Sequence, residues 1–331
     1  GTGQLYFECE YINGKPNGYG KKYFRNNQLK FECNYIDGIP NGKAKQYYPN
    51  GNLFFEGEYI DGKPNRNCKE YYSNGKLKFE CFYIKGLKNG KLIEYFDDGN
   101  LLFEGEYIEG KKNGTGKEYR KNKSILYEGE YLNGRKHGKG KIYYDNGNLM
   151  FEGEFVNGLK NGKGKEFHEN GKIHYEGNYL KDKVDGKVIT YHENGKILLE
   201  GEYINGNENG KIKKYHENGN LYSEAEYKDG KENGILTEYL EDGKLAFQGE
   251  FINGKLNGKF KQCNEKGILI MEGTAKDGHM DGEGKEYYEN GKLKYEGGYK
   301  DGEKQGKGKE YDENGNLIFD GEYNEGEQIK K

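Results

Sequence analysis

Four histidines have a spacing that could support metal binding or titration near neutral pH. His168, His192 and His216 follow one another at intervals of 24 residues, and His174 lies between the first two. Imidazole nitrogens bind zinc, copper and nickel, and a free histidine has a pKa of about 6.5. The alternative is that these histidines are exposed aromatic substitutes for tyrosine, which occupies the same position in other segments. They are weak metal candidates, and we predict no bound metal.

Acidic residues recur at the same interval, for example Glu56, Glu80, Glu104 and Glu128. Catalysis requires a nucleophile, a base and an orienting group that converge at one place. Copies of one residue on successive β-hairpins lie about 10 Å apart, which is too far for chemistry by paired carboxylates. We therefore predict that the protein is not an enzyme and uses no cofactor.

The interval of 24 residues extends over the whole chain of 331 residues. Such a repeat determines the fold, because each unit buries its apolar face against its neighbours. The first aliphatic residue of each unit is place 1. It falls at Leu5, Leu29, Leu53, Leu77, Leu101, Ile125, Leu149, Ile173, Ile197, Leu221, Leu245, Leu269, Leu293 and Leu317, and the last unit, 317–331, is partial. We expect residues 1–331 to form a single repeat array.

Each unit has the pattern of one β-hairpin. Places 1 to 8, as in residues 101–108, alternate apolar and charged residues, which is typical of a half-buried strand. Glycine and asparagine follow at places 9 to 14 and again at places 22 and 23, where they supply the positive φ of tight turns. The sequence therefore predicts an all-β fold, an elongated solenoid-like array of consecutive 24-residue hairpins in one continuous, twisted antiparallel sheet.

The strand register can be inferred in part. If Asn-Gly at places 22 and 23 is a two-residue turn, place 16 lies opposite place 5 of the next unit. A large residue then faces glycine or alanine in the pairs Leu92/Gly105, Val188/Gly201, Ile212/Ala225, Leu236/Gly249 and Phe260/Gly273. Leu101, Phe103 and Tyr107 and their equivalents are predicted to point inward. The aromatic at place 19 conflicts with a regular strand, so either a bulge intervenes or both sheet faces are covered.

Five cysteines are present, an odd number that does not suggest a disulfide framework. Cys9, Cys33 and Cys81 occupy place 5, where other units have glycine, and Cys263 lies elsewhere in its unit. The inferred register places Cys68 opposite Cys81, which makes this pair the candidate for a cross-strand disulfide.

Composition limits the classes of partner. Hydrophobic residues make up 32% of the chain and aromatic residues 15%, and the net charge is −3 with both signs interspersed. This balance gives no electrostatic basis for binding nucleic acid or an anionic membrane. The chain starts at Gly1, in the middle of a unit. We expect a secreted or cell-surface location if a signal peptide precedes this residue, and a cytoplasmic location otherwise.

The unit resembles the MORN repeat, and more closely its bacterial variant. The resemblance rests on residues 103–107 (Phe-Glu-Gly-Glu-Tyr) with Gly110, Gly114 and Gly116, and it covers residues 5–331. It implies hairpin arrays that serve as scaffolds or binding surfaces. Similar bacterial arrays occur as antitoxin or immunity partners of toxins, and others occur on surface-exposed proteins. Many eukaryotic repeats have tryptophan at the second aromatic position, whereas this chain contains none.

Place 20 is the candidate binding site, because it varies and stays large. Its candidate residues are Phe24, Tyr48, Tyr72, Phe96, Tyr144 and Tyr288. Exposed rings flanked by lysine and glutamate are typical of protein interfaces, although they could equally cover the sheet face. We predict a bacterial, non-enzymatic scaffold or spacer that binds another protein of unknown identity. The alternatives are an antitoxin-like inhibitor of a toxin and a phospholipid-binding tether.

Overall fold

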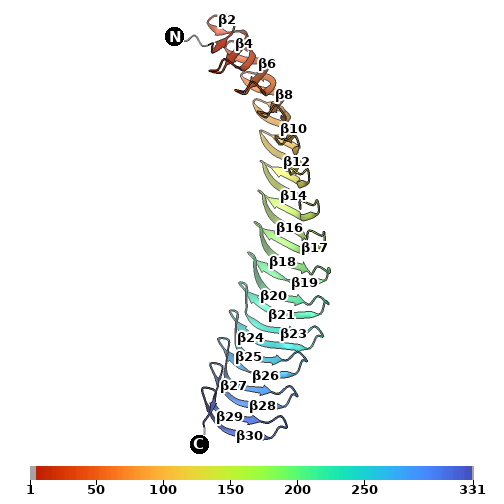
Figure 1. The fold of residues 1–331 in the computed structure, drawn as a ribbon, viewed down its shortest axis with the longest axis vertical. Coiled ribbons are helices and arrows are strands. Elements are labelled where there is room, and N and C mark those ends of the chain that lie inside the picture. The colour runs from red at the N-terminus through yellow and green to blue at the C-terminus, as the bar shows by residue number, and fades with distance from the viewer. Residues whose placement is uncertain (1–4, 330–331) are drawn as a thin grey trace. The chain divides into compact units, whose positions relative to one another are not determined.

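The computed structural model describes residues 5–329, which contain strands and turns and no helix. Contacts divide the chain into two compact units. The first comprises Gly1–Gly162 and Phe167–Gly171, and the second comprises Lys163–Glu166 and Lys172–Lys331. Within each unit, antiparallel pairing of neighbouring strands builds consecutive hairpins, which confirms the predicted all-β fold (Figure 1).

The strands recur at a constant spacing in both units. Those of the first unit are β1 (Phe7–Glu8), β2 (Tyr11–Ile12), β3 (Lys15–Pro16), β4 (Gly18–Tyr23), β5 (Leu29–Ile36), β6 (Ile39–Tyr47), β7 (Leu53–Ile60), β8 (Lys63–Tyr71), β9 (Leu77–Ile84), β10 (Leu87–Tyr95), β11 (Leu101–Ile108), β12 (Lys111–Tyr119), β13 (Ile125–Leu132), β14 (Arg135–Tyr143) and β15 (Leu149–Val156). β16 (Leu159–Phe167) contains the division between the units.

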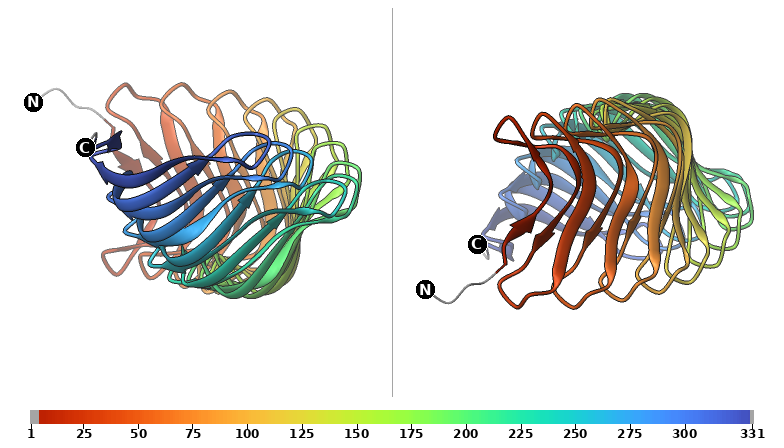
Figure 2. Two further views of the ribbon diagram at one scale, coloured as in Figure 1. Left: turned by 90° about the horizontal axis from the view of Figure 1, so that it is seen from below. Right: turned by 90° about the horizontal axis from the view of Figure 1, so that it is seen from above.

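The second unit continues the same alternation. Its strands are β17 (Ile173–Leu180), β18 (Lys183–Tyr191), β19 (Ile197–Ile204), β20 (Asn207–Tyr215), β21 (Leu221–Lys228), β22 (Lys231–Glu232), β23 (Gly234–Tyr239), β24 (Leu245–Ile252), β25 (Lys255–Cys263), β26 (Leu269–Lys276), β27 (His279–Tyr287), β28 (Leu293–Lys300), β29 (Glu303–Tyr311), β30 (Leu317–Asn324) and β31 (Glu327–Gln328). Within each unit, successive hairpins place their turns in rows along the edges of the sheet (Figure 2).

Each hairpin closes with a two-residue turn at places 9 and 10. Asp61 and Gly62 both have positive φ, 50° and 77°. This conformation is that of a type I′ turn, whose twist matches the flanking strands. The amide of Gly62 also donates to the carbonyl of Pro40 in the preceding hairpin at 2.9 Å, so the turns support one another.

A bulge interrupts the second strand of each hairpin at place 14. In β11 and β12, Gly105 pairs with Gly116, whereas Glu106 pairs with Asn113. Gly114, within the interruption, has a φ of +66°. The prediction that this glycine belongs to the turn is wrong. Gly114 lies in a bulge, four residues after the turn glycine Gly110.

The connection between hairpins is longer than the inferred two-residue turn. The Tyr72 amide donates to the Lys76 carbonyl at 2.8 Å, and the Gly75 amide donates to the Tyr72 carbonyl at 2.9 Å, which leaves a three-residue loop. The register then shifts, because Tyr71 pairs with Leu77 but Glu70 pairs with Phe79. The bulge alternative is therefore confirmed. It compensates for the loop, so place 16 still pairs with place 5, as for Leu92 and Gly105.

Aromatic rings fill the core face of the first unit. Phe103 contacts Tyr107 of its own strand and Tyr131 of the next hairpin in edge-on geometry, with centroids 5.9 and 5.7 Å apart. Phe103 and Tyr107 are buried, as predicted, and Leu101 is half-buried. A Cβ added to Gly105 would lie 2.6 Å from Phe103 Cζ. The small residues at places 5 and 16 therefore provide the space into which each ring packs.

The second unit uses the same packing with some exchanges. Tyr295 contacts Tyr299 and Tyr323 at centroid distances of 5.3 and 5.4 Å, and Met280 packs against this cluster. Earlier in the unit, Ile212 at place 16 occupies the space beside Ala225. The space at places 5 and 16 can thus be filled in two ways. Either both places are glycine and a large ring packs over them, or place 16 carries an aliphatic side chain beside a small residue at place 5.

Candidate functional site: a charged groove on the sheet

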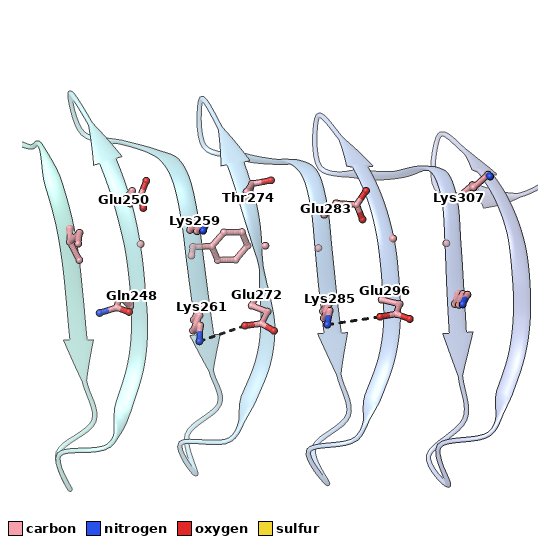
Figure 3. Close-up of a pocket in the computed structure, with 18 of the residues that line it drawn as sticks. Gln248, Glu250, Lys259, Lys261, Glu272, Thr274, Glu283, Lys285, Glu296 and Lys307 are labelled. Carbon is pink, nitrogen blue, oxygen red and sulfur yellow. Dashed lines mark ion pairs between the residues drawn. The ribbon is translucent and has the colours of Figure 1, made fainter.

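A groove of about 700 Å³ crosses the strands of the second unit on the face opposite the aromatic core (Figure 3). It extends over residues of β23 to β30, from Ile235 to Asp320. Its floor is the backbone of places 5 and 16, whose side chains point to the core. Two rows of outward-pointing side chains form the walls. A similar groove of about 530 Å³ lies in the first unit between Tyr19 and Glu80.

The first wall is formed by places 4 and 17, which face one another on neighbouring strands. Lys261 pairs with Glu272 and Lys285 pairs with Glu296 in the register, with ion-pair distances of 3.7 and 3.9 Å. Lys309 follows opposite Glu296. Adjacent strands lie about 4.8 Å apart, and the sign of charge reverses at each strand from Lys261 to Asp320.

The second wall is formed by places 6 and 15. It contains Glu250, Lys259, Thr274, Glu283 and Lys307. Figure 3 shows these side chains on one side of the floor and Lys261, Glu272, Lys285 and Glu296 on the other. Because the two rows are separated by one inward-pointing residue on each strand, the groove follows directly from the alternation of a β-strand.

Tyrosines at place 19 hold the carboxylates of the first wall. Tyr287 donates to Glu272 at 2.7 Å, and Tyr311 donates to Glu296 at 3.0 Å. Burial, followed by the hydrogen bond to Glu272, raises the pKa of Tyr287 to about 12. The phenol therefore remains a donor at neutral pH, and it orients the carboxylate beside its lysine neighbours.

This arrangement spreads charged groups of both signs along the groove. In the first wall, lysine and glutamate alternate as ion pairs. Such a surface recognises a partner whose own charges alternate at a similar spacing, because each pair then meets its opposite. Among residues 5–329, no group of three or more His, Cys, Asp or Glu side chains is placed to hold a metal ion.

The candidate rings at place 20 have an internal bonding role. The hydroxyl of Tyr48 donates to the Tyr71 carbonyl at 2.9 Å, and Tyr72, Tyr144 and Tyr288 each donate to the carbonyl 23 residues further on. Phe24 and Phe96 are half-buried under lysine side chains. These contacts support the alternative that the rings cover the sheet, and their role in binding stays a prediction.

Two of the candidate histidines make the same bond as these tyrosines. His192 Nε2 lies 2.8 Å from the Tyr215 carbonyl, and His216 Nε2 lies 2.9 Å from the Tyr239 carbonyl. A carbonyl only accepts, so Nε2 carries the proton in both rings. This supports the interpretation of these histidines as substitutes for tyrosine.

The strand register separates His174 from His192. Tyr175 at place 3 pairs with Thr190 at place 18 of the same hairpin, so place 2 and place 20 are not opposed. The register therefore does not place His174 opposite His192. His168 shares place 20 with His192 and His216.

Two members of the acidic row singled out in the sequence, Glu56 and Glu80, line the groove of the first unit. Glu104, at place 4, pairs with Lys117. Lys91 pairs with Glu106. Places 6 and 15, which form the second wall, were not predicted, although their outward direction follows from alternation with the inward places 5 and 16.

A further exposed row was also missed. Aliphatic side chains at place 8 stand beside the two-residue turns, and Ile84, Ile108 and Leu132 are all exposed. They belong to the first unit, and their signal in the sequence is the aliphatic residue that precedes each place-9 turn.

The chain belongs to the MORN repeat family. The MORN repeat model matches residues 8–28, 103–125, 127–149, 151–173 and 295–317. The MORN repeat variant matches residues 40–61, 67–85, 88–109, 184–205, 208–229, 232–253 and 280–301. MORN repeats are generally associated with binding to proteins or membranes.

Solved structures similar to this chain include toxin-complex proteins. One is TcdB2-TccC3-TEV, with 11% identity over 88% of this chain and 18% of that chain, and a TM-score of 0.17. Another is the Tc holotoxin pore of Photorhabdus luminescens, with 10% identity over 95% of this chain and 23% of that chain, and a TM-score of 0.18. The chain thus spans about a fifth of their length, and such scores do not establish a common fold.

No curated protein matches the chain. Within residues 5–329 there is no helix with the length and apolarity needed to cross a bilayer.

Proposed function

We propose that this MORN-repeat chain is a non-enzymatic binding protein that holds another protein across the charged groove of its second unit. The observation that supports the proposal is the pair of charged walls over a bare backbone floor between Ile235 and Asp320. The lysine–glutamate ion pairs and the place-19 tyrosines hold the side chains of the first wall in place in the absence of a partner. Such preorganisation reduces the entropy lost on binding.

Crosslinking at defined positions tests the proposal. A photo-crosslinking amino acid replaces Lys285 in the groove or, as a matched control, Lys141, which also occupies place 17 and also pairs with glutamates on both sides. We expect one protein to crosslink in cells at the Lys285 position and not at the Lys141 position. Mass spectrometry of the crosslinked product names that partner, and its identity distinguishes a scaffold from an antitoxin-like inhibitor.

Charge inversion then tests whether the walls carry the affinity. Lys261→Glu combined with Lys285→Glu should weaken binding of the purified partner at least tenfold, because like charges then face one another across the interface. Lys141→Glu should leave the affinity unchanged. Equal effects of the groove and control variants would contradict the proposal.

A membrane tether is the remaining alternative. Sedimentation with vesicles of phosphatidylserine in phosphatidylcholine at low salt measures it directly. Strong sedimentation that Lys261→Glu with Lys285→Glu abolishes, together with no crosslinked protein, would replace the protein-binding proposal by a lipid-binding one.

A further inference from the structure

Two thiols face one another across consecutive hairpins of the first unit. Cys68 in β8 and Cys81 in β9 are direct partners in the antiparallel register. Both side chains lie on the core face, where Cys68 is 1% and Cys81 4% exposed, and both are free thiols. The predicted opposition of these residues is thus confirmed.

Direct opposition in an antiparallel register brings two residues within the reach of a disulfide. Directly opposed residues of antiparallel strands have Cα atoms about 4.5–5.5 Å apart, and disulfides bridge Cα atoms about 4.4–6.8 Å apart. Both side chains leave the same face of the sheet, so no strand has to turn over to bring the sulfurs together.

Cys33 provides a natural comparison. It occupies place 5, as Cys81 does, and it is also buried. Its partners in the register are Gly20 on one side and Ala44 on the other. Cys33 therefore has no cysteine opposite it, whereas Cys81 faces Cys68 at place 16 of the neighbouring strand.

We propose that Cys68 and Cys81 are a site of reversible disulfide formation that links hairpin β7–β8 to hairpin β9–β10. The oxidant is a small-molecule disulfide of the glutathione class. One cysteine thiolate attacks the oxidant to give a mixed disulfide and releases one thiol. The second cysteine attacks the protein sulfur of that mixed disulfide and releases a second thiol. Two protein thiols are oxidised, and one oxidant disulfide is reduced to two thiols.

Burial controls when this reaction occurs. Desolvation raises the pKa of Cys81 to about 12 and raises the pKa of Cys68 as well. Since the thiolate is the nucleophile, the folded protein reacts slowly, and oxidation takes place during folding or when β8 and β9 separate.

The bond would lie beneath the groove of the first unit. Asn67 and Lys69 flank Cys68, Glu80 precedes Cys81, and all three line that groove. A covalent link at this point would fix the register of the strands that carry these wall residues. The redox state of the pair would thereby determine how firmly this part of the wall is held.

Refolding in a glutathione redox buffer tests the proposal on the full chain. After acid quenching, alkylation and digestion, we expect a linked peptide pair containing Cys68 and Cys81, lighter by two hydrogens, while Cys33 is alkylated. The oxidised protein should unfold at a higher urea concentration than the reduced protein. The variant Cys33→Ser should behave in the same way, and Cys81→Ala should lose both the linked peptide and the urea shift.

Two results would overturn the proposal. One is alkylation of both Cys68 and Cys81 in protein that has refolded to the native circular dichroism spectrum in the most oxidising buffer. The other is a linked peptide that joins Cys68 to Cys33 rather than to Cys81.

Discussion

Lysines at place 12 lie directly over the aromatic core. Lys112 Nζ is 4.0 Å from the ring centroid of Phe103 and 2.6 Å from Glu118 Oε1. Both charged side chains are only 22% exposed. The charge is thus stabilised by a ring face and a carboxylate together, in a site where water competes weakly.

Removing Lys112 should lower the free energy of unfolding more than removing Lys117, which lies on the outer face of the same strand. Lys112→Met should lower the free energy of unfolding by about 2 kcal/mol, because Glu118 loses its partner and the cation–π contact is lost. Lys117→Met, which removes an ion pair of 3.8 Å to Glu128 on the outer face, should cost about 0–1 kcal/mol. Urea unfolding of the two variants measures the difference, and equal losses would contradict this account of the core face.

Buried phenols predict how stability depends on pH. Burial, and secondarily the charge of Glu94, raises the pKa of Tyr107 to about 12, and burial does the same for Tyr295. An unfolded tyrosine ionises at about pH 10. Below that pH both states hold the proton, and the stabilisation is fully present. Between about pH 10 and 12 the unfolded state ionises first, so the free energy of unfolding falls as the pH rises.

The phenolate absorbance of the folded protein measures this shift. We expect the buried tyrosines, such as Tyr107 and Tyr295, to titrate at about pH 12, together with cooperative loss of the β-sheet signal in circular dichroism. A sample unfolded in urea should titrate near pH 10. Titration of the folded sample near pH 10 without unfolding would show that the rings are not buried as described.

The bulge at place 14 is the element that the sequence pattern concealed. A glycine at place 14 fits either a bulge within the strand or the end of a longer turn, because both require a residue with positive φ. The hairpin, its two strands and the inward places 3 and 7 could be predicted, because alternation specifies them. The bulge could not, because it depends on how hydrogen bonds continue beyond the turn.

A glycine without neighbours isolates the backbone requirement of this bulge. Gly90 has a φ of +78°, and no atom lies within 4 Å of an added Cβ. Gly90→Ala should therefore lower the free energy of unfolding by about 1–2 kcal/mol through backbone strain alone. Lys91→Ala, the next residue on the same strand, should change it by less than about 0.5 kcal/mol. Urea unfolding compares them, and a neutral Gly90→Ala would remove the argument for a left-handed backbone at place 14.

Across the whole chain, the 24-residue frame determines both the core and the grooves. Leu92 opposite Gly105 and Cys68 opposite Cys81 could be predicted, since the three-residue loop and the register shift between places 18 and 19 offset one another. The place-20 tyrosines were chosen as a binding site because their size was visible in the sequence. Their hydroxyl bonds to backbone carbonyls in the next hairpin were not visible, because such bonds require the three-residue loops to be placed in space.

The charged groove illustrates the same limit. Each wall residue was visible as a recurring lysine or glutamate, and a solvated row of charges was the natural interpretation. Place 15 lies next to the inward place 16, so its outward direction follows from alternation, as for Lys259 and Glu283. The groove between the two outward rows depends on how the strands lie in space, which the repeat pattern does not specify.

The pairing of place 17 with place 4 of the next hairpin tests this register most directly, because the core, the groove and the cysteine pair all depend on it. Lys117 and Glu128 are direct partners, whereas Glu130 lies two residues further along the same face. In an oxidising buffer, Lys117→Cys with Glu128→Cys should form a disulfide, because opposed Cα atoms are within its reach. Lys117→Cys with Glu130→Cys should not, because a diagonal pair is about 7–8 Å apart. Crosslinking of the Glu130 pair in preference to the Glu128 pair would contradict the register and with it the proposed sites.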